Sequence, residues 1–502
     1  MSRGYRHPLY LADQVREIDR RTIDSQEAGD GFALMQRAAL AAYQQLRQRW
    51  PQARHVCVVC GAGNNAGDGY VIAALAARDG LDVSLIAVRS PDELKGDAAR
   101  AHAMAQAESL QARPWQDAMP LSGDVVVDAL LGTGLGGDVR EPFASAIAAI
   151  NASGLPVLAV DVPSGLAADT GRVLGKAVEA DLTVTFIADK FGLHTGKAAD
   201  HVGRVVYCGL GIEPQAQADI EPPAELLDAG LIHEALPPRR RTSHKGNFGH
   251  LLVIGGAPGF GGAALLASEA GARLGAGKIS LATAPENVGA SLIRTPEIMA
   301  RGVRGVSDAR PLIDMADVIV VGPGLGKDAW GQAMLQAALD AGKPLVIDAD
   351  GLNLLALCWP DLQRDDWLLT PHPGEAGRLL DSSGGEVESD RLSAVRDLRQ
   401  RRHGTIVLKG AGTLVAGATG IGVCPYGNPG MASGGTGDVL SGMLGALIAQ
   451  GLSMEQAGRV GVTLHALAGD RAAEREGERG LLAGDLASYA RMLMNPDNRH
   501  SS

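Results

Sequence analysis

Short apolar segments that end in glycine-rich turns recur along this chain, and helical segments separate them. In the first half these apolar segments are residues 56–60, 83–88, 125–131, 157–160 and 182–186. In the second half they are residues 251–254, 278–282, 317–321, 345–348, 368–370 and 405–409. Parallel strands need crossover connections, which are usually helices. The alternation therefore predicts an α/β protein built on parallel sheets.

The alternation breaks once, in a segment rich in proline, alanine and acidic residues. This segment, residues 216–238, separates two blocks that each repeat the strand–helix order. A chain of 502 residues is also too long for one ordinary hydrophobic core. We therefore predict two α/β domains, residues 1–215 and residues 239–502, joined by a linker with room for a short helix at 223–235.

Composition argues against several classes of partner. The net charge is -11 and aromatic residues make up 4%, which disfavours a nucleic-acid partner and a basic membrane anchor. No run of about 18 apolar residues is present, so we expect no membrane span. Residues 1–24 are charged and lack the apolar segment of a signal peptide.

Cysteine usage points to a reducing compartment. Five cysteines are too few and too scattered for a disulfide framework, so we expect a cytoplasmic protein. Cys57 and Cys60 form a C-x-x-C pattern within a predicted strand. Three residues apart on a strand, their thiols face opposite sides. We expect both to pack in the core rather than to bind a metal or form a redox pair.

A glycine-rich loop follows the first predicted strand. Residues 61–69 carry Asn64, Asn65 and Asp68 between glycines, which free backbone amides for close approach to a ligand. No Gly-Lys-Ser/Thr sequence follows, so this is not a Walker loop. A purely structural turn would not need three short polar side chains, although that interpretation stays open. We expect a helix from residue 70 to residue 78 after the loop.

Three charged residues stand at the ends of later strands. Asp128 lies inside one predicted strand, Asp161 directly follows the next, and Lys190 lies in the turn after a third. Open α/β sheets hold their ligands at the carboxyl ends of the strands, so we expect these side chains to converge on one pocket. A hydrogen bond within a loop would explain any one of them alone equally well.

The three motifs Gly61-x-Gly-Asn-Asn-x-Gly-Asp-Gly69, Asp128-Ala-Leu-Leu-Gly-Thr-Gly134 and Asp161-Val-Pro-Ser-Gly165 resemble, in order and spacing, those of the NAD(P)H-hydrate epimerases. The resemblance implies an N-terminal Rossmann-like three-layer sandwich. It also implies interconversion of the R and S hydrates of NADH and NADPH (NADHX and NADPHX).

The same resemblance implies roles for individual residues. A potassium ion (K+) would be held by Asn65, Asp128 and Ser164. Asp161 would transfer protons, with Lys190 as a helper. Contacts to the hydrate are implied for Asn64, Asn65, Ala66, Gly67, Asp68, Gly132, Thr133, Gly134, Leu135, Gly136, Gly137, Asp138 and Asp161.

These residue types suit the chemistry on their own terms. Epimerising a carbon that bears a hydroxyl beside a nitrogen needs proton transfer and stabilisation of a charged intermediate. A carboxylate with a nearby ammonium supplies both. Hard oxygen ligands suit an alkali cation better than a transition metal.

Ala66 stands where the family often has glycine, and we expect its methyl group to be tolerated unless the position needs a positive φ.

In the second half, residues 428–442 combine five glycines with one acid, Asp438. Apolar residues at helical spacing follow, so the loop leads into a helix. Helix-start amides suit a phosphate, and a carboxylate there can take a proton from a hydroxyl that is being phosphorylated. The alternative is a glycine-rich turn in which Asp438 only caps the helix.

Motifs spread over residues 240–490 resemble the ADP-dependent NAD(P)H-hydrate dehydratases, a branch of the ribokinase-like superfamily. The stretches that carry this resemblance are His244-Lys-Gly246, Gly261-Gly-Ala-Ala264, Gly322-Pro-Gly-Leu-Gly326, Thr370-Pro-His-Pro-Gly-Glu375, Lys409-Gly410 and Gly434-Gly-Thr-Gly-Asp438. The resemblance implies a C-terminal ribokinase-like α/β domain. It also implies dehydration of the S hydrate to NAD(P)H at the expense of ADP, giving AMP and phosphate.

By this resemblance, Asp438 is the base that activates the substrate hydroxyl, and Mg2+ accompanies the diphosphate of ADP. Phosphorylation turns the hydroxyl into a good leaving group, whose loss restores the nicotinamide. Hydrate contacts are implied for Ala263, Gly324, His372 and Asp438. Nucleotide contacts are implied for Lys409, Gly410, Ala411, Gly412, Thr413 and Gly437.

The sequence as a whole predicts a bifunctional NAD(P)H-hydrate repair enzyme that acts on small molecules and self-associates as a homo-oligomer. Two alternatives stay open at this point. The second half could be a vitamin or sugar kinase of the ribokinase-like superfamily, since the glycine-rich loop is shared across that superfamily. The first half could be catalytically idle and only bind nucleotides or a protein. His372, which lies between two prolines, could also serve only to hydrogen-bond the backbone.

Overall fold

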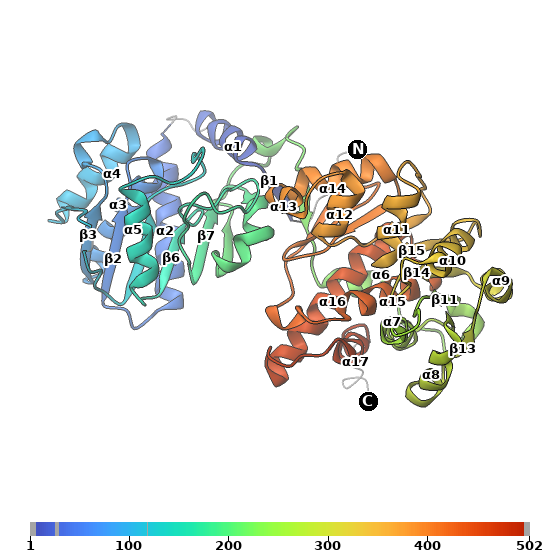
Figure 1. Ribbon diagram of the computed structural model, residues 1–502. Coiled ribbons are helices and arrows are strands. Elements are labelled where there is room, and N and C mark those ends of the chain that lie inside the picture. Colours follow the sequence, from blue (N-terminus) through green and yellow to red (C-terminus); the bar gives the residue numbers. More distant parts are fainter. Residues whose placement is uncertain (1–6, 26–29, 118, 496–502) are drawn as a thin grey trace. The chain divides into compact units, whose positions relative to one another are not determined.

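The computed structural model describes residues 7–25, 30–117 and 119–495 (Figure 1). The chain divides into two compact units, Met1–Glu225 and Leu226–Ser502, here called unit 1 and unit 2. The division falls inside the predicted linker. That segment holds strand β10 (Ala224–Leu226) and helix α6 (Gly230–Ala235), so the helix predicted at 223–235 begins later than expected because a strand comes first.

Unit 1 is built on one parallel sheet with the strand order β4-β3-β2-β5-β6-β7-β9. The strands are β2 (His55–Cys60), β3 (Asp82–Ala87), β4 (Arg113–Pro114), β5 (Val125–Ala129), β6 (Val157–Val160), β7 (Leu182–Phe186) and β9 (Arg204–Cys208). The central strands are buried on both faces, which is why they are continuous apolar runs in the sequence.

Helices cover both faces of this sheet and complete the predicted three-layer sandwich (Figure 1). They are α1 (Ala12–Asp24), α2 (Gly31–Arg49), α3 (Asn64–Arg78), α4 (Gly96–Ala107) and α5 (Phe143–Ala152). Cys60 packs in the core cluster that includes α2, α3 and α4, and Cys57 packs in the separate cluster that includes α5. The two thiols therefore face opposite sides of β2 and are core residues, as predicted.

Helix α3 corrects one expectation. It begins at Asn64, so most of the predicted loop 61–69 is the first two turns of a helix. Glycine is unfavourable inside a helix, but packing requires it here. A Cβ on Gly69 would lie 2.5 Å from the Ala129 side chain, and one on Gly67 would lie 2.6 Å from Met35. Ala66 is buried in this helix, where a methyl group is accommodated.

A short strand pair lies beside the main sheet of unit 1. Strand β1 (Pro8–Tyr10) runs parallel to β8 (Asp189–Lys190), with Tyr10 opposite Lys190. Helix α1 follows β1 directly and buries Ala12, Val15, Ile18 and Thr22. The pairing fixes the backbone of Lys190.

Unit 2 has a sheet with the order β13-β12-β11-β14-β15-β16-β17-β18-β19. Its strands are parallel from β13 to β17, and β18 and β19 continue it as an antiparallel hairpin. The strands are β11 (His250–Ile254), β12 (Lys278–Thr283), β13 (Met299–Gly302), β14 (Val318–Val321), β15 (Leu345–Ile347), β16 (Trp367–Leu369), β17 (Thr405–Leu408), β18 (Thr413–Ala416) and β19 (Ile421–Cys424).

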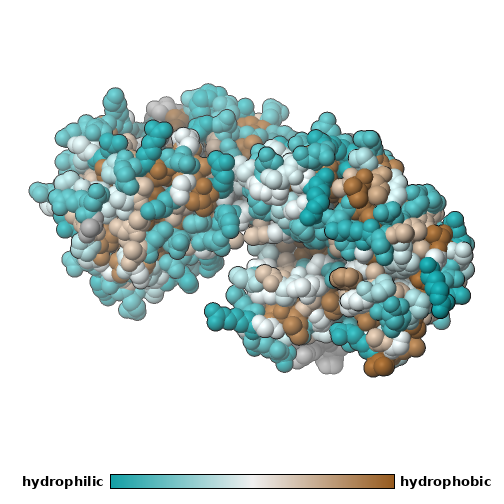
Figure 2. Space-filling view, in the orientation of Figure 1, coloured by the Kyte–Doolittle hydropathy of each residue, from teal (hydrophilic) through white to brown (hydrophobic). Residues whose placement is uncertain are grey.

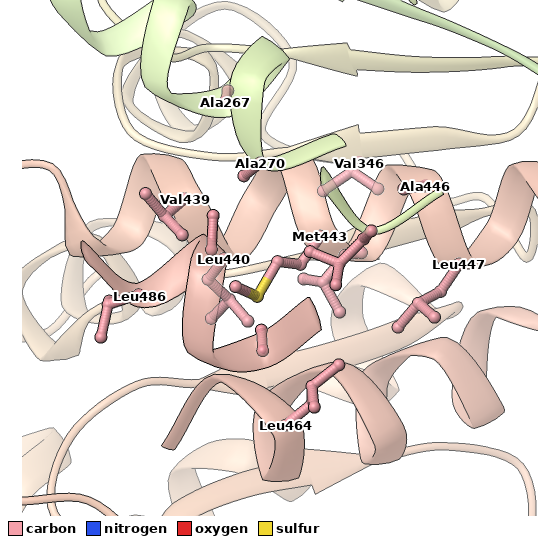
Figure 3. Close-up of a cluster of buried hydrophobic side chains, with 14 of the residues drawn as sticks. Ala267, Ala270, Val346, Val439, Leu440, Met443, Ala446, Leu447, Leu464 and Leu486 are labelled. Carbon is pink, nitrogen blue, oxygen red and sulfur yellow. The ribbon is translucent and has the colours of Figure 1, made fainter. Parts of the chain in front are cut away.

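The main core of unit 2 lies between this sheet and a layer of helices. The helices of the unit, besides α6, are α7 (Gly261–Arg273), α8 (Val288–Arg294), α9 (Val306–Met315), α10 (Ala329–Leu339), α11 (Asp350–Cys358), α12 (Pro373–Leu380), α13 (Gly384–Ser389), α14 (Arg391–Arg402), α15 (Thr436–Ala449), α16 (Met454–Glu476) and α17 (Ala483–Leu493). Figure 3 shows Val439, Met443 and Leu447 of α15 packed with Leu464 of α16 and Leu486 of α17. Helix α15 is therefore held firmly along its length, which fixes the position of its first turn.

Hydrophilic residues dominate the face of each unit that Figure 2 shows, and hydrophobic residues there form scattered patches. Among the described helices, none is both long and apolar enough to cross a membrane. All five cysteines are free thiols.

Candidate active sites

Unit 1 contains a cavity of about 610 Å³ at the carboxyl ends of β2, β5, β6 and β7. The turns after these strands form one wall, and α1 and the start of α2 form another. Ten residues predicted from the sequence line it: Asn64, Asn65, Asp68, Gly132, Thr133, Gly134, Leu135, Gly136, Asp161 and Lys190. Ala66, Gly67, Gly137, Asp138, Asp128 and Ser164 are not part of its lining.

Asp161 and Lys190 form an ion pair in this cavity. The Lys190 ammonium donates hydrogen bonds to Asp161 Oδ1, to Thr185 Oγ1 at 2.9 Å and to the Phe186 carbonyl at 3.0 Å. Lys190 is 1% exposed and Asp161 is 19% exposed. An ammonium has three N–H groups, so all of those on Lys190 have protein acceptors. Lys190 therefore holds Asp161 in place.

The two oxygens of Asp161 have different surroundings. Oδ1 also accepts hydrogen bonds from Thr185 Oγ1 at 3.1 Å and from the Phe186 amide at 3.3 Å. Oδ2 has no hydrogen bond to any residue that the structure describes. Asp161 has a φ of 67°, an unfavourable backbone conformation of the kind that is concentrated at functional sites. One carboxylate oxygen is thus anchored and the other is available to a ligand.

Asp128 is completely buried behind the cavity wall. The Ser164 hydroxyl donates to Asp128 Oδ1 at 2.6 Å, and the Ser164 amide donates to Oδ2 at 2.8 Å. Burial raises the pKa of Asp128 to about 6. Asn65 lies on the cavity wall, and its side-chain nitrogen is buried with no hydrogen-bond partner among the described residues. An unsatisfied buried amide is costly and indicates an unfilled interaction.

In unit 2, helix α15 begins beside Gly435, whose φ is 99°. No side chain caps this helix, so its first amides are available to an anion. Asp438 lies in the first turn and is not the cap, which excludes the alternative in which it serves only as a cap. Burial, together with the carboxylate of Asp348, raises the pKa of Asp438 to about 7.

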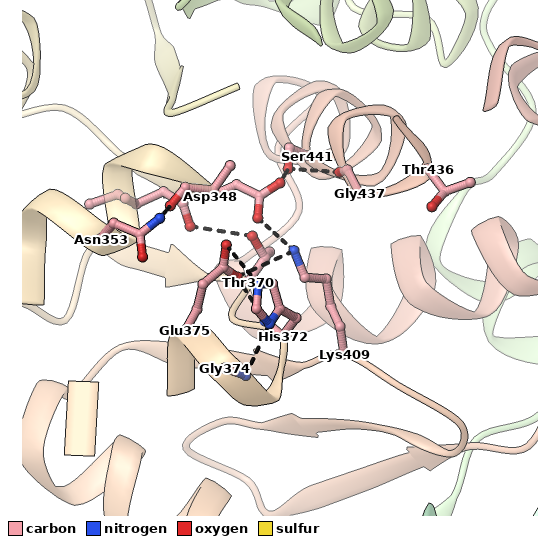
Figure 4. A network of polar contacts seen from close by, with 12 residues as sticks. Asp348, Asn353, Thr370, His372, Gly374, Glu375, Lys409, Thr436, Gly437 and Ser441 are labelled. Atoms are coloured by element: carbon pink, nitrogen blue, oxygen red, sulfur yellow. Dashed lines mark hydrogen bonds and ion pairs between the residues drawn. The ribbon is translucent and has the colours of Figure 1, made fainter. Parts of the chain in front are cut away.

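A polar network extends from this turn across the ends of three strands (Figure 4). Lys409 Nζ donates to Asp348 Oδ1 at 2.7 Å and lies 3.8 Å from Glu375 Oε2. The Ser441 hydroxyl donates to Asp348 Oδ2 at 2.6 Å. A Cβ on Gly437 would lie 3.4 Å from Lys409 Nζ, so the start of α15 and Lys409 are close neighbours. The network brings Lys409, Gly437 and Asp438 together.

His372 caps helix α12. Its Nδ1 accepts a hydrogen bond from the Gly374 amide at 3.0 Å, so the proton of the neutral ring is on Nε2. Nε2 lies 3.4 Å from Glu375 Oε1, and the side chain is 51% exposed. Burial lowers the pKa of His372, and burial raises that of Glu375 to about 7. His372 thus bonds the backbone, as one sequence interpretation held, and still presents a donor at the surface.

The remaining predicted residues of unit 2 lie at the start of α7, in the turn after β14 and around the turn after β17. Gly324 has a φ of 57°, and a Cβ on it would lie 3.2 Å from Ala263. In the same turn, the Gly326 amide donates to Asp350, which acts electrostatically on Asp438. The second turn joins β17 to β18 and contains Gly410, Ala411 and Gly412, and Thr413 is the first residue of β18.

Comparison with known proteins shows which family the chain resembles. The family described as NAD(P)H-hydrate dehydratase matches residues 251–491, and the one described as YjeF-related protein N-terminus matches residues 31–192. The bifunctional NAD(P)H-hydrate repair enzyme Nnr of Coxiella burnetii is 47% identical over 97% of this chain and 99% of its own length. The enzyme of the same name from Escherichia coli is 44% identical over 98% and 95%.

The chain belongs to the bifunctional NAD(P)H-hydrate repair enzymes. This confirms the family predicted from the motifs and an enzyme that joins an epimerase domain to a dehydratase domain. A crystal structure of the ADP/ATP-dependent NAD(P)H-hydrate dehydratase of Bacillus subtilis, co-crystallised with ATP and Mg2+, is 27% identical and covers 53% of this chain and 96% of its own, with a TM-score of 0.47.

The repair enzyme also has site residues that sequence reasoning did not select: Asp19, Asp348, Glu375 and His465. Asp19 has the same helical phase on α1 as Val15 and Ile23, and all three line the unit 1 cavity, so this spacing was a usable signal. His465 is buried in α16 and its Nε2 lies 3.0 Å from the Thr436 carbonyl. Burial lowers the pKa of His465 to about 4, so it is neutral and donates to the start of α15.

For the repair enzyme we predict that Gly435→Ala destabilises unit 2 by about 1–2 kcal/mol, the cost of a left-handed conformation for an L-residue. The added methyl would also lie 2.6 Å from Leu266 and 3.1 Å from Ala483. Calorimetric unfolding and ADP binding measure the effect. Gly289→Ala is the matched control, since nothing lies within 4 Å of its added methyl. Equal stability of the two variants would contradict the prediction.

Proposed function

We propose that unit 1 interconverts the R and S hydrates of NADH and NADPH, and that unit 2 dehydrates the S hydrate with ADP, giving NAD(P)H, AMP and phosphate. The observation that carries the proposal is that each unit has a carboxyl group suited to proton transfer where its strands end. In unit 1 this is Asp161, with one oxygen free beside the cavity. In unit 2 it is Asp438, at an uncapped helix start.

In unit 1, the free oxygen of Asp161 accepts the hydroxyl proton of the hydrate. Lys190 keeps Asp161 correctly oriented, because its ammonium is itself held by three acceptors. The glycines and Thr133 in the turn after β5 line the same cavity and leave room for the substrate. The cavity of about 610 Å³ falls in the range usual for small-molecule sites.

The residues present fit a potassium ion. Asp128 and Ser164 supply hard oxygen atoms, and the unsatisfied amide of Asn65 can present its oxygen instead of its nitrogen. These residues would hold the ion, which would supply fixed positive charge for the negatively charged parts of the substrate. Ser164 also accepts a hydrogen bond from the Leu131 amide at 2.8 Å, which links the set to the turn after β5.

In unit 2, Asp438 accepts the proton of the hydrate hydroxyl as that oxygen attacks the terminal phosphate of ADP. The amides at the start of α15 and the Lys409 ammonium are placed to bind phosphate oxygens. Mg2+ would accompany the diphosphate. Among the described residues no cluster of three metal-binding side chains exists, so the nucleotide would have to supply much of the coordination.

The test is repair itself. The full chain, incubated with mixed hydrates, ADP and Mg2+, should restore the near-ultraviolet absorbance of reduced nicotinamide from both epimers. Failure to restore it would contradict the proposal. Phosphorylation of a hydroxymethylpyrimidine or a hydroxyethylthiazole faster than hydrate turnover would favour the kinase alternative.

We also propose a cytoplasmic location, which suits the five free thiols. We propose in addition that the chain forms a homo-oligomer, which light scattering would test.

Dehydration should slow as the pH falls below about 7. Asp438 must be ionised to accept a proton, and its pKa is raised to about 7, so acid progressively removes the active form. Asp348→Asn removes a charge that raises this pKa and frees Lys409 to lower it further. We predict that the acid limb of kcat/KM then moves to lower pH.

The pH profile of Glu375→Gln is the control, because Glu375 also has a pKa of about 7. If Asp438 produces the limb, the limb persists in this variant. A limb that disappears with Glu375, or one that moves to higher pH in Asp348→Asn, would contradict the assignment to Asp438.

A further inference from the structure

Two acids in the unit 1 cavity have no partner. Asp19 of α1 and Asp68 of α3 line the cavity together with Asp161 and Lys190. Neither the Asp19 carboxyl group nor the Asp68 carboxyl group makes a hydrogen bond or an ion pair with any residue that the structure describes. The other charged residues of the lining do: Arg16 pairs with Asp13, and Asp97 pairs with Arg100.

The charges of this cavity do not balance if every group ionises. The one lysine, Lys190, has each of its N–H groups bonded, one of them to Asp161. Asp19 and Asp68 would then be two further negative charges near a third in a half-enclosed space, which favours the neutral form of one of them. Burial, with the carboxylates of Asp161 and Asp19, raises the pKa of Asp68 well above its usual range.

The reaction proposed for this cavity needs an acid as well as a base. When the hydroxyl proton passes to Asp161, the bond from that carbon to the ring nitrogen breaks and a carbonyl forms. The electron pair left on nitrogen must receive a proton. The carbonyl then rotates, and the nitrogen attacks its other face and gives up its proton. The carbonyl oxygen takes back the proton from Asp161 and becomes a hydroxyl again. The protons therefore balance and no outside reagent is needed. Lys190 is fully engaged and cannot supply the proton.

We infer that Asp68 is the acid that protonates the ring nitrogen during epimerisation, and that Asp19 keeps Asp68 protonated between turnovers. This rests on the epimerase activity proposed for unit 1. The arrangement matches a general pattern in which two carboxyl groups of one site serve as acid and base because their surroundings differ. Asp161 is bonded to an ammonium, whereas Asp68 lines the cavity without an ion-pair partner and is acted on electrostatically by the carboxylates of Asp161 and Asp19.

Asp68→Asn tests the acid directly. We expect the rate of R-to-S conversion to fall on the order of 100- to 10,000-fold in kcat, the usual contribution of a general acid, with KM little changed. Asp68→Glu should recover part of this activity because it restores a carboxyl group. A rise in KM with kcat preserved in Asp68→Asn would show that Asp68 only binds substrate, and would overturn the inference.

The pH profile of Asp19→Asn provides an independent readout. In the unaltered enzyme, epimerisation should decline on the alkaline side as Asp68 loses its proton. Removing the Asp19 charge makes that loss easier, so the alkaline limb should move to lower pH. A limb that stays in place or moves to higher pH would overturn the role of Asp19, and this result stands even if Asp68→Asn fails to fold.

Asp161→Asn distinguishes a failure of this inference from a failure of the epimerase activity proposed for unit 1. If Asp161→Asn and Asp68→Asn both lose epimerisation, the epimerase proposal and the role of Asp68 are both supported. If only Asp161→Asn loses it, the epimerase proposal stands and the acid is not Asp68. If Asp161→Asn retains full activity, the proposed function of the cavity itself is wrong.

Discussion

Replacing Asp438 with asparagine is expected to stop dehydration of the S hydrate while epimerisation continues. Asparagine has nearly the same shape but cannot accept the hydroxyl proton, and loss of a general base costs on the order of 100- to 10,000-fold in rate. The substitution lies in the first turn of α15, whose later turns are fixed in the core of unit 2. With R hydrate as the starting material, the S hydrate should therefore form and then persist.

Asp328→Asn is the matched control for this variant. Asp328 caps helix α10 by accepting a hydrogen bond from the Gly331 amide at 3.0 Å, and it is outside the network around Asp438. Because asparagine caps a helix about as well as aspartate, we expect stability to change little and dehydration to be retained. Loss of both reactions in Asp438→Asn would mean that the two activities are coupled or that the chain has not folded.

The second large effect is expected for Asp161→Asn. The R hydrate should disappear only at its rate without enzyme, whereas the S hydrate is still converted to NAD(P)H. Asparagine keeps the shape of the side chain but removes the charge that pairs with Lys190 and the free oxygen beside the cavity. The expected fall in epimerisation is again on the order of 100- to 10,000-fold. Chromatographic separation of the two epimers over time measures it.

Asp124→Asn controls for the loss of a carboxylate from unit 1. Asp124 accepts hydrogen bonds from the Arg54 and His55 amides at 2.7 and 2.9 Å, directly before strand β5 and so at the opposite end of the sheet from the cavity. We expect it to epimerise at the normal rate. If R hydrate disappears equally fast with Asp161→Asn, then the catalytic group of unit 1 is a different residue.

The central parallel strands of both sheets could be predicted from the sequence because they are largely buried and are therefore apolar runs. The strands β4, β9 and β13, which are partly exposed, were not predicted. Helix starts were harder to predict. Asn64, Gly67 and Gly69 are poor helix formers, yet all three belong to α3. Glycine is needed at positions 67 and 69 because Met35 and Ala129 approach too closely for a larger side chain. Tertiary packing overrode local propensity there.

The site residues likewise divide into those that local sequence position marks and those that only tertiary contacts reveal. Acids that directly follow a strand, such as Asp161, could be selected because strand ends meet at one edge of a sheet. Asp19 shares the helical phase of Val15 and Ile23, a signal that the sequence analysis did not use, and its place in the site became clear only when α1 was seen to line the cavity. His465 contacts the Thr436 carbonyl, and Glu375 lies near Lys409. These partners are far apart in the sequence, and a single sequence does not show such contacts.

Mixing Asp161→Asn with Asp438→Asn tests most directly whether two separate acids perform the two reactions. One variant retains the site in unit 2, and the other retains the site in unit 1. Supplied with R hydrate, ADP and Mg2+, each variant alone should leave nearly all of the reduced nicotinamide unrestored, and the mixture should restore it completely. A mixture no more active than either variant alone would contradict the account.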